Sequence, residues 1–142
     1  VFIVMSIIIS IIYSKFSPVS VIQILYYYIA MSLFLLGISW LTSSTSLFVN
    51  DIKNVTKVIV QFGFWLSPIF WHINMIPENL QWIAKLNPMH YILTGYRDSI
   101  FNGIPFWAKQ GETIYFWSLT IIFIVVGAIV FKRLKPHFEE VI

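Results

Sequence analysis

The sequence predicts an all-α, polytopic membrane protein. Three long runs carry no charged side chain, and they cover residues 16–50, 58–77 and 113–131. Charged residues make up only 11% of the chain, apolar residues 58%, and the mean hydropathy is +0.82. A soluble domain averages roughly 25% charged residues. A helix of ~20 residues reaches about 30 Å, the thickness of the hydrocarbon core of a bilayer. Each run is therefore long enough to cross a membrane.

The composition and the missing motifs exclude several functions. Cysteine is absent, so the chain forms no disulfide and no thiolate metal site. A net charge of +3 gives no basic patch suited to nucleic acid. The chain has no G-x-x-x-x-G-K-[ST] phosphate loop and no H-E-x-x-H motif. The isolated histidines His72, His90 and His137 are expected at interfaces or on the surface. We expect no cofactor, metal or ATP to be bound by this chain itself.

Four membrane-spanning helices are expected, the first of them partial. The chain opens inside an apolar stretch, so residue 1 is interpreted as a cut within a span and the chain as the C-terminal part of a longer protein. The charged stretch 50–57, with Asp51 and Lys53, is expected to be a loop. The expected spans are residues 1–14, 20–42, 58–72 and 113–131.

Cations beside the last span predict its orientation. Lys132, Arg133 and Lys135 follow directly after it. Because cytoplasmic flanks of spans are enriched in Lys and Arg, the C-terminus is expected in the cytoplasm. Counting spans backwards places the loop 50–57 on the same side and the segment 73–112 outside.

The expected spans contain no charged side chain. Ion-coupled transporters place ionisable groups near the middle of the membrane. If this protein is a transporter, its energy is therefore expected to come from a separate ATPase.

The outer segment is expected to form a re-entrant pair of short helices. Pro77 and Glu78 suit a first helical turn, since proline needs no N–H donor there and an acid favours the positive end of the helix dipole. Asn87-Pro88 breaks the helix, and the Asn87 side chain is expected to cap the freed backbone groups. The two expected helices, both too short to span, are residues 77–86 and 88–101.

The second short helix is expected to have two different faces and to end at Gly103 and Pro105. The apolar face carries Met89, Ile92, Leu93, Tyr96 and Ile100. The polar face carries His90, Thr94, Arg97, Asp98 and Phe101. Two interpretations of Arg97 and Asp98 stay open. They belong either to a solvated face, or to the outer vestibule, where they pair or meet an anionic substrate.

Aromatic side chains near the outer segment also have two interpretations. Most of them suit a belt facing lipid at the interface. Four of them are alternatively candidates for lining a sugar path, namely Trp71, Trp82, Tyr91 and Tyr96.

The order of several short motifs resembles the C-terminal half of type-2 ABC exporter permeases. The order S-P-I-F-W, I-P, N-P and Y-R-D is similar to the polysaccharide-export branch, and the tract 77–107 is most similar to teichoic acid translocation permeases of Gram-positive bacteria. The segments that carry the resemblance are residues 66–71, 76–79, 86–88, 91–92 and 95–98.

This resemblance implies a permease subunit in the cell membrane that moves lipid-linked wall teichoic acid or a related polysaccharide. It implies a permease homodimer, two copies of a separate ATP-binding subunit, an undecaprenyl-diphosphate-linked polymer as substrate, and an outer gate formed by the two short helices. The chain would then be the C-terminal part of a single transmembrane permease domain. The implied gate and path residues are Trp71, Trp82, Asn87, Pro88, Tyr91, Tyr96, Arg97 and Asp98.

The alternative is a membrane-embedded transferase or hydrolase that acts on a lipid-linked sugar. Such an enzyme needs carboxylates or histidine at the membrane face. Glu78, His90 and Asp98 supply these groups, but no two of them have a catalytic spacing in the sequence.

Overall fold

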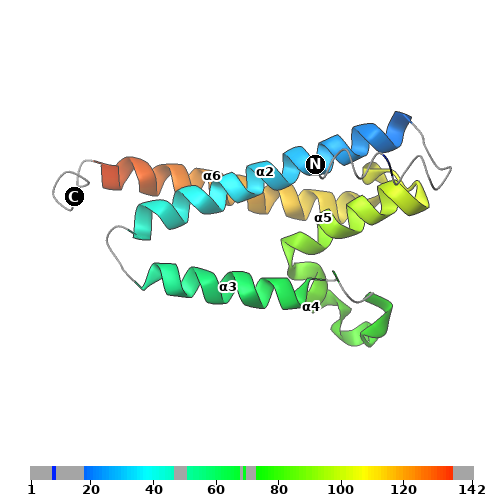
Figure 1. Ribbon diagram of the computed structural model, residues 1–142, viewed down its shortest axis with the longest axis horizontal. Helices are drawn as coiled ribbons and strands as arrows, with labels where there is room; N and C mark the ends of the chain where they lie inside the picture. The colour runs from blue at the N-terminus through cyan, green and yellow to red at the C-terminus, as the bar shows by residue number, and fades with distance from the viewer. Residues whose placement is uncertain (1–7, 9–17, 47–50, 68, 70–72, 136–142) are drawn as a thin grey trace.

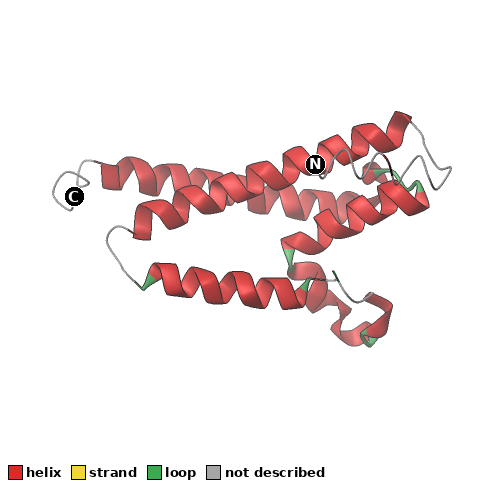
Figure 2. Cartoon of the chain, in the orientation of Figure 1, coloured by secondary structure: helices red, strands yellow, loops and turns green. Residues whose placement is uncertain are grey.

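The computed structural model describes residues 8, 18–46, 51–67, 69 and 73–135. This part of the chain is almost entirely helical and contains no strand (Figure 2), which confirms the all-α fold class. The expected first span, residues 1–14, lies outside the described residues apart from Ile8. The α-helices are α2 (Pro18–Ser46), α3 (Ile52–Leu66), α4 (Gln81–Leu86), α5 (Pro88–Arg97) and α6 (Gln110–Leu134). Short 3₁₀ or π turns are η1 (Ile73–Met75), η2 (Glu78–Leu80), η3 (Asp98–Asn102) and η4 (Phe106–Lys109).

Two helices have the length and hydropathy of membrane spans. They cover Val19–Ser46 and Phe106–Leu134, with mean hydropathies of 2.0 and 2.5. Figure 1 shows α2 and α6 side by side along the length of the molecule. They run in the same direction, because Tyr26 contacts Trp117 and Gly37 contacts Ile124. Both helices extend beyond the expected spans at 20–42 and 113–131.

Glycines allow α2 and α6 to approach closely. A Cβ atom at Gly37 would lie 3.0 Å from the backbone nitrogen of Ile124, and one at Gly127 would lie 3.0 Å from the carbonyl oxygen of Gly37. Small residues at such contacts are typical of helix packing in membranes, where close van der Waals packing replaces a hydrophobic driving force. The pair of spans therefore forms a tight unit against which the other elements pack.

Helix α3 differs from the expected charged loop and third span. The loop predicted over 50–57 is wrong, because the chain is helical from Ile52 and the N–H groups of Asn54 and Val55 both donate to the Asp51 carbonyl. The helix ends at Leu66, before the expected end at residue 72. Ser67 is extended, with φ −81° and ψ 137°, as expected for a residue that precedes proline.

The outer segment contains the two expected helical pieces with altered ends. Pro77 precedes the first turn instead of occupying it, and a 3₁₀ turn at Glu78–Leu80 leads into α4. The second piece is α5, which ends at Arg97 and continues as the π turn η3. Gly103 ends this turn in the left-handed conformation, with φ 66°, as its position in the sequence predicted.

Helix α5 packs against both long helices and forms the core with them. A Cβ atom at Gly95 would lie only 2.1 Å from Cζ of Tyr27, so the glycine admits the ring of Tyr27 directly onto the α5 backbone. α3 and α5 both point toward the start of α2, and together they follow α2 along its length (Figure 1). The buried apolar residues of this core are Ile24, Tyr27, Ala30, Phe34, Tyr91, Ile92, Tyr96, Ile100 and Phe116.

Candidate functional site

The Asn87-Pro88 elbow joins α4, α5 and the end of α3. Asn87 Oδ1 accepts a hydrogen bond from the Met89 N–H at 3.0 Å, which confirms its predicted role as a helix cap. Asn87 Nδ2 also donates to the Gly63 carbonyl at 3.1 Å and to Ser67 Oγ at 2.9 Å. The connection to α3 was not predicted. These two bonds give hydrogen-bond partners to the Gly63 carbonyl and the Ser67 hydroxyl at the end of α3. Polar groups in a membrane interior need such partners, because lipid offers none.

The elbow lies at the level of the middle of the two long helices. It lines an apolar cavity of about 470 Å³ together with the central parts of α2 and α6. The elbow therefore lies at a depth that the hydropathy of α2 and α6 assigns to the membrane interior. This is the position expected for the tip of a re-entrant helix pair. Residues that place the elbow at this level are Phe34, Leu119 and Phe123, beside Asn87, Pro88 and Met89.

A chain of polar aromatic contacts joins α5 to both long helices. The hydroxyl groups of Tyr26 and Tyr91 lie 3.1 Å apart, and Tyr91 is also 3.1 Å from Thr113 Oγ1. Trp117 Nε1 donates to the Tyr26 hydroxyl at 2.7 Å. Phe106 stacks on Tyr26, with ring centroids 4.3 Å apart. These contacts fix the re-entrant helix against α2 and α6 by directional bonds as well as by packing.

The tyrosines proposed for a sugar path belong to this packed core. Tyr91 is 4% exposed and Tyr96 is 7% exposed, so little ring surface is left for a passing polymer. Burial raises the pKa of both phenols, that of Tyr96 to about 12. Trp82 is exposed, and its role in stacking stays a prediction. Trp71 lies outside the described residues.

The polar residues predicted for one face of the second short helix do line one cavity, but two of them are not solvated. His90 and Asp98 are buried, with exposed fractions of 4% and 6%. Asp98 is stabilised there because both carboxylate oxygens have donors, Asn102 Nδ2 at 2.7 Å and Lys109 Nζ at 2.5 Å. Arg97 is half-buried beside them. Sequence reasoning missed Lys109, which lies across a turn from Asp98 and shares no local motif with it.

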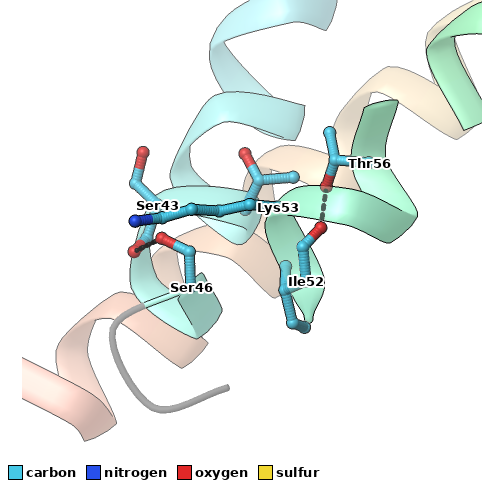
Figure 3. Close-up of a pocket in the computed structure, with 6 residues that line it drawn as sticks. Ser43, Ser46, Ile52, Lys53 and Thr56 are labelled. Atoms are coloured by element: carbon cyan, nitrogen blue, oxygen red, sulfur yellow. Dashed lines mark hydrogen bonds between the residues drawn. The ribbon is translucent and has the colours of Figure 1, made fainter. Parts of the chain in front are cut away.

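The junction between α2 and α3 forms a small polar pocket. The Lys53 side chain lies across it toward Ser43 (Figure 3). Three hydroxyl groups at the pocket donate hydrogen bonds to backbone carbonyls of their own helices, namely those of Thr42, Ser46 and Thr56. Their oxygen atoms can therefore still accept a hydrogen bond from a cation. This pocket therefore suits the Lys53 ammonium group. Asp51 precedes α3, but its side chain makes no capping hydrogen bond.

The described residues offer little support for metal or paired acid–base chemistry. Within them, no group of three or more His, Cys, Asp or Glu side chains is placed to hold a metal ion. Glu78 lines a different pocket from His90 and Asp98. Asp98 is bound by Lys109 and Asn102, so it is a poor general base.

The fold and this site define a polytopic all-α membrane protein in which a short helix pair is fixed against two long spans. Residues 1–101 match the ABC2_membrane family, described as ABC-2 type transporter, and the chain belongs to this family.

Two curated proteins are similar in sequence to this chain. Both are the O-antigen export system permease protein RfbA of Klebsiella pneumoniae. One is 31% identical over 114 residues, and the other is 30% identical over 115 residues. Each alignment covers 80% of this chain and 43% of the relative, so the chain spans less than half the length of these relatives.

Proposed function

We propose that this chain forms part of the permease subunit of an ABC exporter that moves a lipid-linked cell-surface polysaccharide across the cytoplasmic membrane. The observation that carries the proposal is the 31% identity to an O-antigen export permease over 80% of the chain. The re-entrant helix pair, which lies beside two spans that contain no midplane charge, suits a polymer exporter whose energy comes from another subunit.

The proposed assembly is a permease homodimer with two copies of a separate subunit that binds and hydrolyses ATP. In the proposed topology, the junction of α2 and α3 faces the cytoplasm and the segment from η1 to η4 faces outward. None of the 15 residues of α3 is buried, and its end is bonded to the elbow through Asn87. A shift of α3 would therefore reach the outer helix pair through a direct hydrogen-bonded contact.

The gate would be formed by α4 and α5. The Tyr91 contacts hold α5 against α2 and α6 in the closed arrangement, and opening would require movement of this unit or of α4 alone. Trp82 on α4 is exposed and would offer a ring on which sugars stack.

The polymer is proposed to be undecaprenyl-diphosphate-linked wall teichoic acid or a related surface polysaccharide. The tract 77–107 supports teichoic acid by its motif order, and the relatives' names support a carbohydrate polymer of the O-antigen kind. We propose the same polyisoprenoid-diphosphate carrier for either polymer, so that one permease architecture would serve both.

The full-length permease with its ATP-binding subunit tests this function in proteoliposomes. Lipid-linked teichoic acid and lipid-linked O-antigen are supplied on the face that binds ATP, and polymer on the other face is measured with and without ATP. Movement of intact polymer that requires ATP supports export, and the preferred polymer identifies the substrate. Polymer that is cleaved or transferred without movement would support the alternative, a membrane-embedded transferase or hydrolase.

A further inference from the structure

Four side chains on three helices form one line of hydrogen bonds that begins and ends on α6. Trp117 Nε1 donates to the Tyr26 hydroxyl on α2 at 2.7 Å, and this hydroxyl lies 3.1 Å from that of Tyr91 on α5. The Tyr91 hydroxyl also lies 3.1 Å from Thr113 Oγ1, which donates to the Lys109 carbonyl at 3.0 Å. Trp117 and Thr113 are four residues apart, so they share one face of α6. We call the four side chains the hydroxyl circuit.

The two end groups set the direction of every bond in the circuit. An indole N–H can only donate, and a backbone carbonyl can only accept. The Thr113 proton is used on the Lys109 carbonyl, so Tyr91 must donate to Thr113. The Tyr91 proton is then used, so Tyr26 must donate to Tyr91 while its oxygen accepts from Trp117. A single arrangement of protons therefore satisfies the whole circuit.

Ring packing around Tyr91 is separate from the circuit. Phe116 stacks on the Tyr91 ring with centroids 5.0 Å apart, and Tyr27 meets it edge to face at 5.4 Å. A hydrogen bond from Tyr27 would use the second lone pair of the Tyr91 oxygen and leave the order of protons unchanged. Removing a hydroxyl group alone therefore breaks the circuit and keeps the ring packing.

Directional bonds matter for α5 because of its length and its surroundings. With 10 residues it is too short to span a bilayer. Lipid is as apolar as a helix surface, so apolar burial does little to hold helices together in a membrane, and packing and interhelical hydrogen bonds do this instead. The Tyr91 hydroxyl supplies two such bonds, one to α2 and one to α6.

We propose that Tyr26, Tyr91, Thr113 and Trp117 are positioning residues that keep the re-entrant helix closed against the two spans until the ATP-binding subunit acts. The assignment of α5 to a gate rests on the proposed function. Movement of α5 away from the spans breaks both Tyr91 bonds together, because one hydroxyl is the donor in one bond and the acceptor in the other. The circuit is therefore either complete or broken, which gives the gate two discrete states.

Thr113 allows the sharpest test, because its hydroxyl and its size can be changed separately. Thr113→Val keeps the volume and removes the acceptor, whereas Thr113→Ser keeps the hydroxyl and loses a methyl group. The full-length permease with its ATP-binding subunit is reconstituted in proteoliposomes loaded with calcein, and dye release is measured without ATP. We expect release to rise about threefold or more in Thr113→Val, as for loss of one hydrogen bond, and to stay unchanged in Thr113→Ser.

Tyr91→Phe is the second variant, since it breaks the circuit and keeps the ring. It should raise release as Thr113→Val does, and the double variant should release little more than either single one, because both changes break the same circuit. Thr120→Val is the matched control on α6. It removes a hydroxyl that donates to the Phe116 carbonyl of its own helix, so release should not change.

Release that rises in Thr113→Ser and not in Thr113→Val would assign the position of α5 to packing and overturn the proposal. Unchanged release in both Thr113→Val and Tyr91→Phe, or an equal rise in Thr120→Val, would also overturn it. Polymer movement driven by ATP is measured separately with the unchanged protein. Intact export with no effect of the circuit variants rejects the circuit alone, whereas absent export of the unchanged protein rejects the proposed function.

Discussion

The side-chain amide of Asn87 donates a hydrogen bond to the hydroxyl of Ser67 at 2.9 Å, and this bond joins the end of α3 to the start of α5. The same amide donates to the Gly63 carbonyl, to which Ser67 Oγ also donates at 2.7 Å. The backbone N–H of Ser67 donates to the Phe64 carbonyl and not to the Gly63 carbonyl. The side chains of Asn87 and Ser67 therefore supply the hydrogen-bond donors that the Gly63 carbonyl would otherwise lack. One residue therefore both starts one helix and completes another.

Changes at Asn87 should separate these two roles. Asn87→Ser keeps an oxygen that can cap α5 but is too short to reach α3, whereas Asn87→Ala removes both contacts. We expect Asn87→Ala to lower the free energy of unfolding by about 2–4 kcal/mol. The loss in Asn87→Ser should be about 1 kcal/mol smaller than the loss in Asn87→Ala, because the cap of α5 is kept. Thermal unfolding of the purified protein in detergent measures both. Equal stability of Asn87→Ala and the unchanged protein would contradict the bridging role.

The close contact between Gly95 and Tyr27 should not tolerate a methyl group. A Cβ atom at Gly95 overlaps the buried Tyr27 ring, so Gly95→Ala should destabilise the protein by about 1–3 kcal/mol through overpacking. The double variant with Tyr27→Leu should recover part of this loss, because the ring that clashes is gone. Gly63→Ala is the control on another helix, since nothing lies within 4 Å of the added atom. If both alanines cost the same, the packing of α5 on α2 is different from that described.

Stability should fall in alkaline solution because of the buried Tyr96 phenol. Its pKa is raised by burial from 10.0 to about 12. The unfolded chain therefore loses this proton first, so the stabilisation is complete below pH 10 and is lost as pH rises toward 12. Denaturation followed from pH 9 to 12 should show a shallower decline for Tyr96→Phe, since phenylalanine does not ionise. An unchanged slope in that variant would assign the alkaline transition to other groups.

The proposed topology predicts that residues 79 and 135 lie on opposite sides of the membrane. Asn79 and Lys135 are both exposed and both lie outside the core. Single cysteines at these positions, in a cysteine-free background, should react differently with a membrane-impermeant maleimide. We expect labelling of position 79 in intact cells and of position 135 only after permeabilisation. The opposite pattern would invert the orientation and move the helix pair to the cytoplasmic side.

The sequence predicted the elements that depend on local chemistry. Charge-free runs predicted α2 and α6, Asn87-Pro88 predicted a capped helix start, and Gly103 predicted a helix end. These features depend on neighbours in the sequence, so one chain is enough to recognise them.

Contacts between distant segments could not be predicted in the same way. Tyr26 and Tyr91 are 65 positions apart, and Asp98 meets Lys109 only because η3 and η4 turn the chain back. The burial of Asp98 follows from that pairing, and this is why the interpretation of Asp98 as part of a solvated face is wrong. A glycine within α5, Gly95, was the one local sign of a close approach.

The central claim, polysaccharide export, is tested most directly by deleting the gene for the full-length permease in its native cell. Surface polysaccharide and its lipid-linked precursor inside the cell are both measured, with the intact gene restored as control. The account predicts loss of surface polymer together with accumulation of complete lipid-linked polymer inside. Unchanged surface polymer, or an internal precursor that stops at an earlier chemical step, would contradict export and favour an enzymatic role.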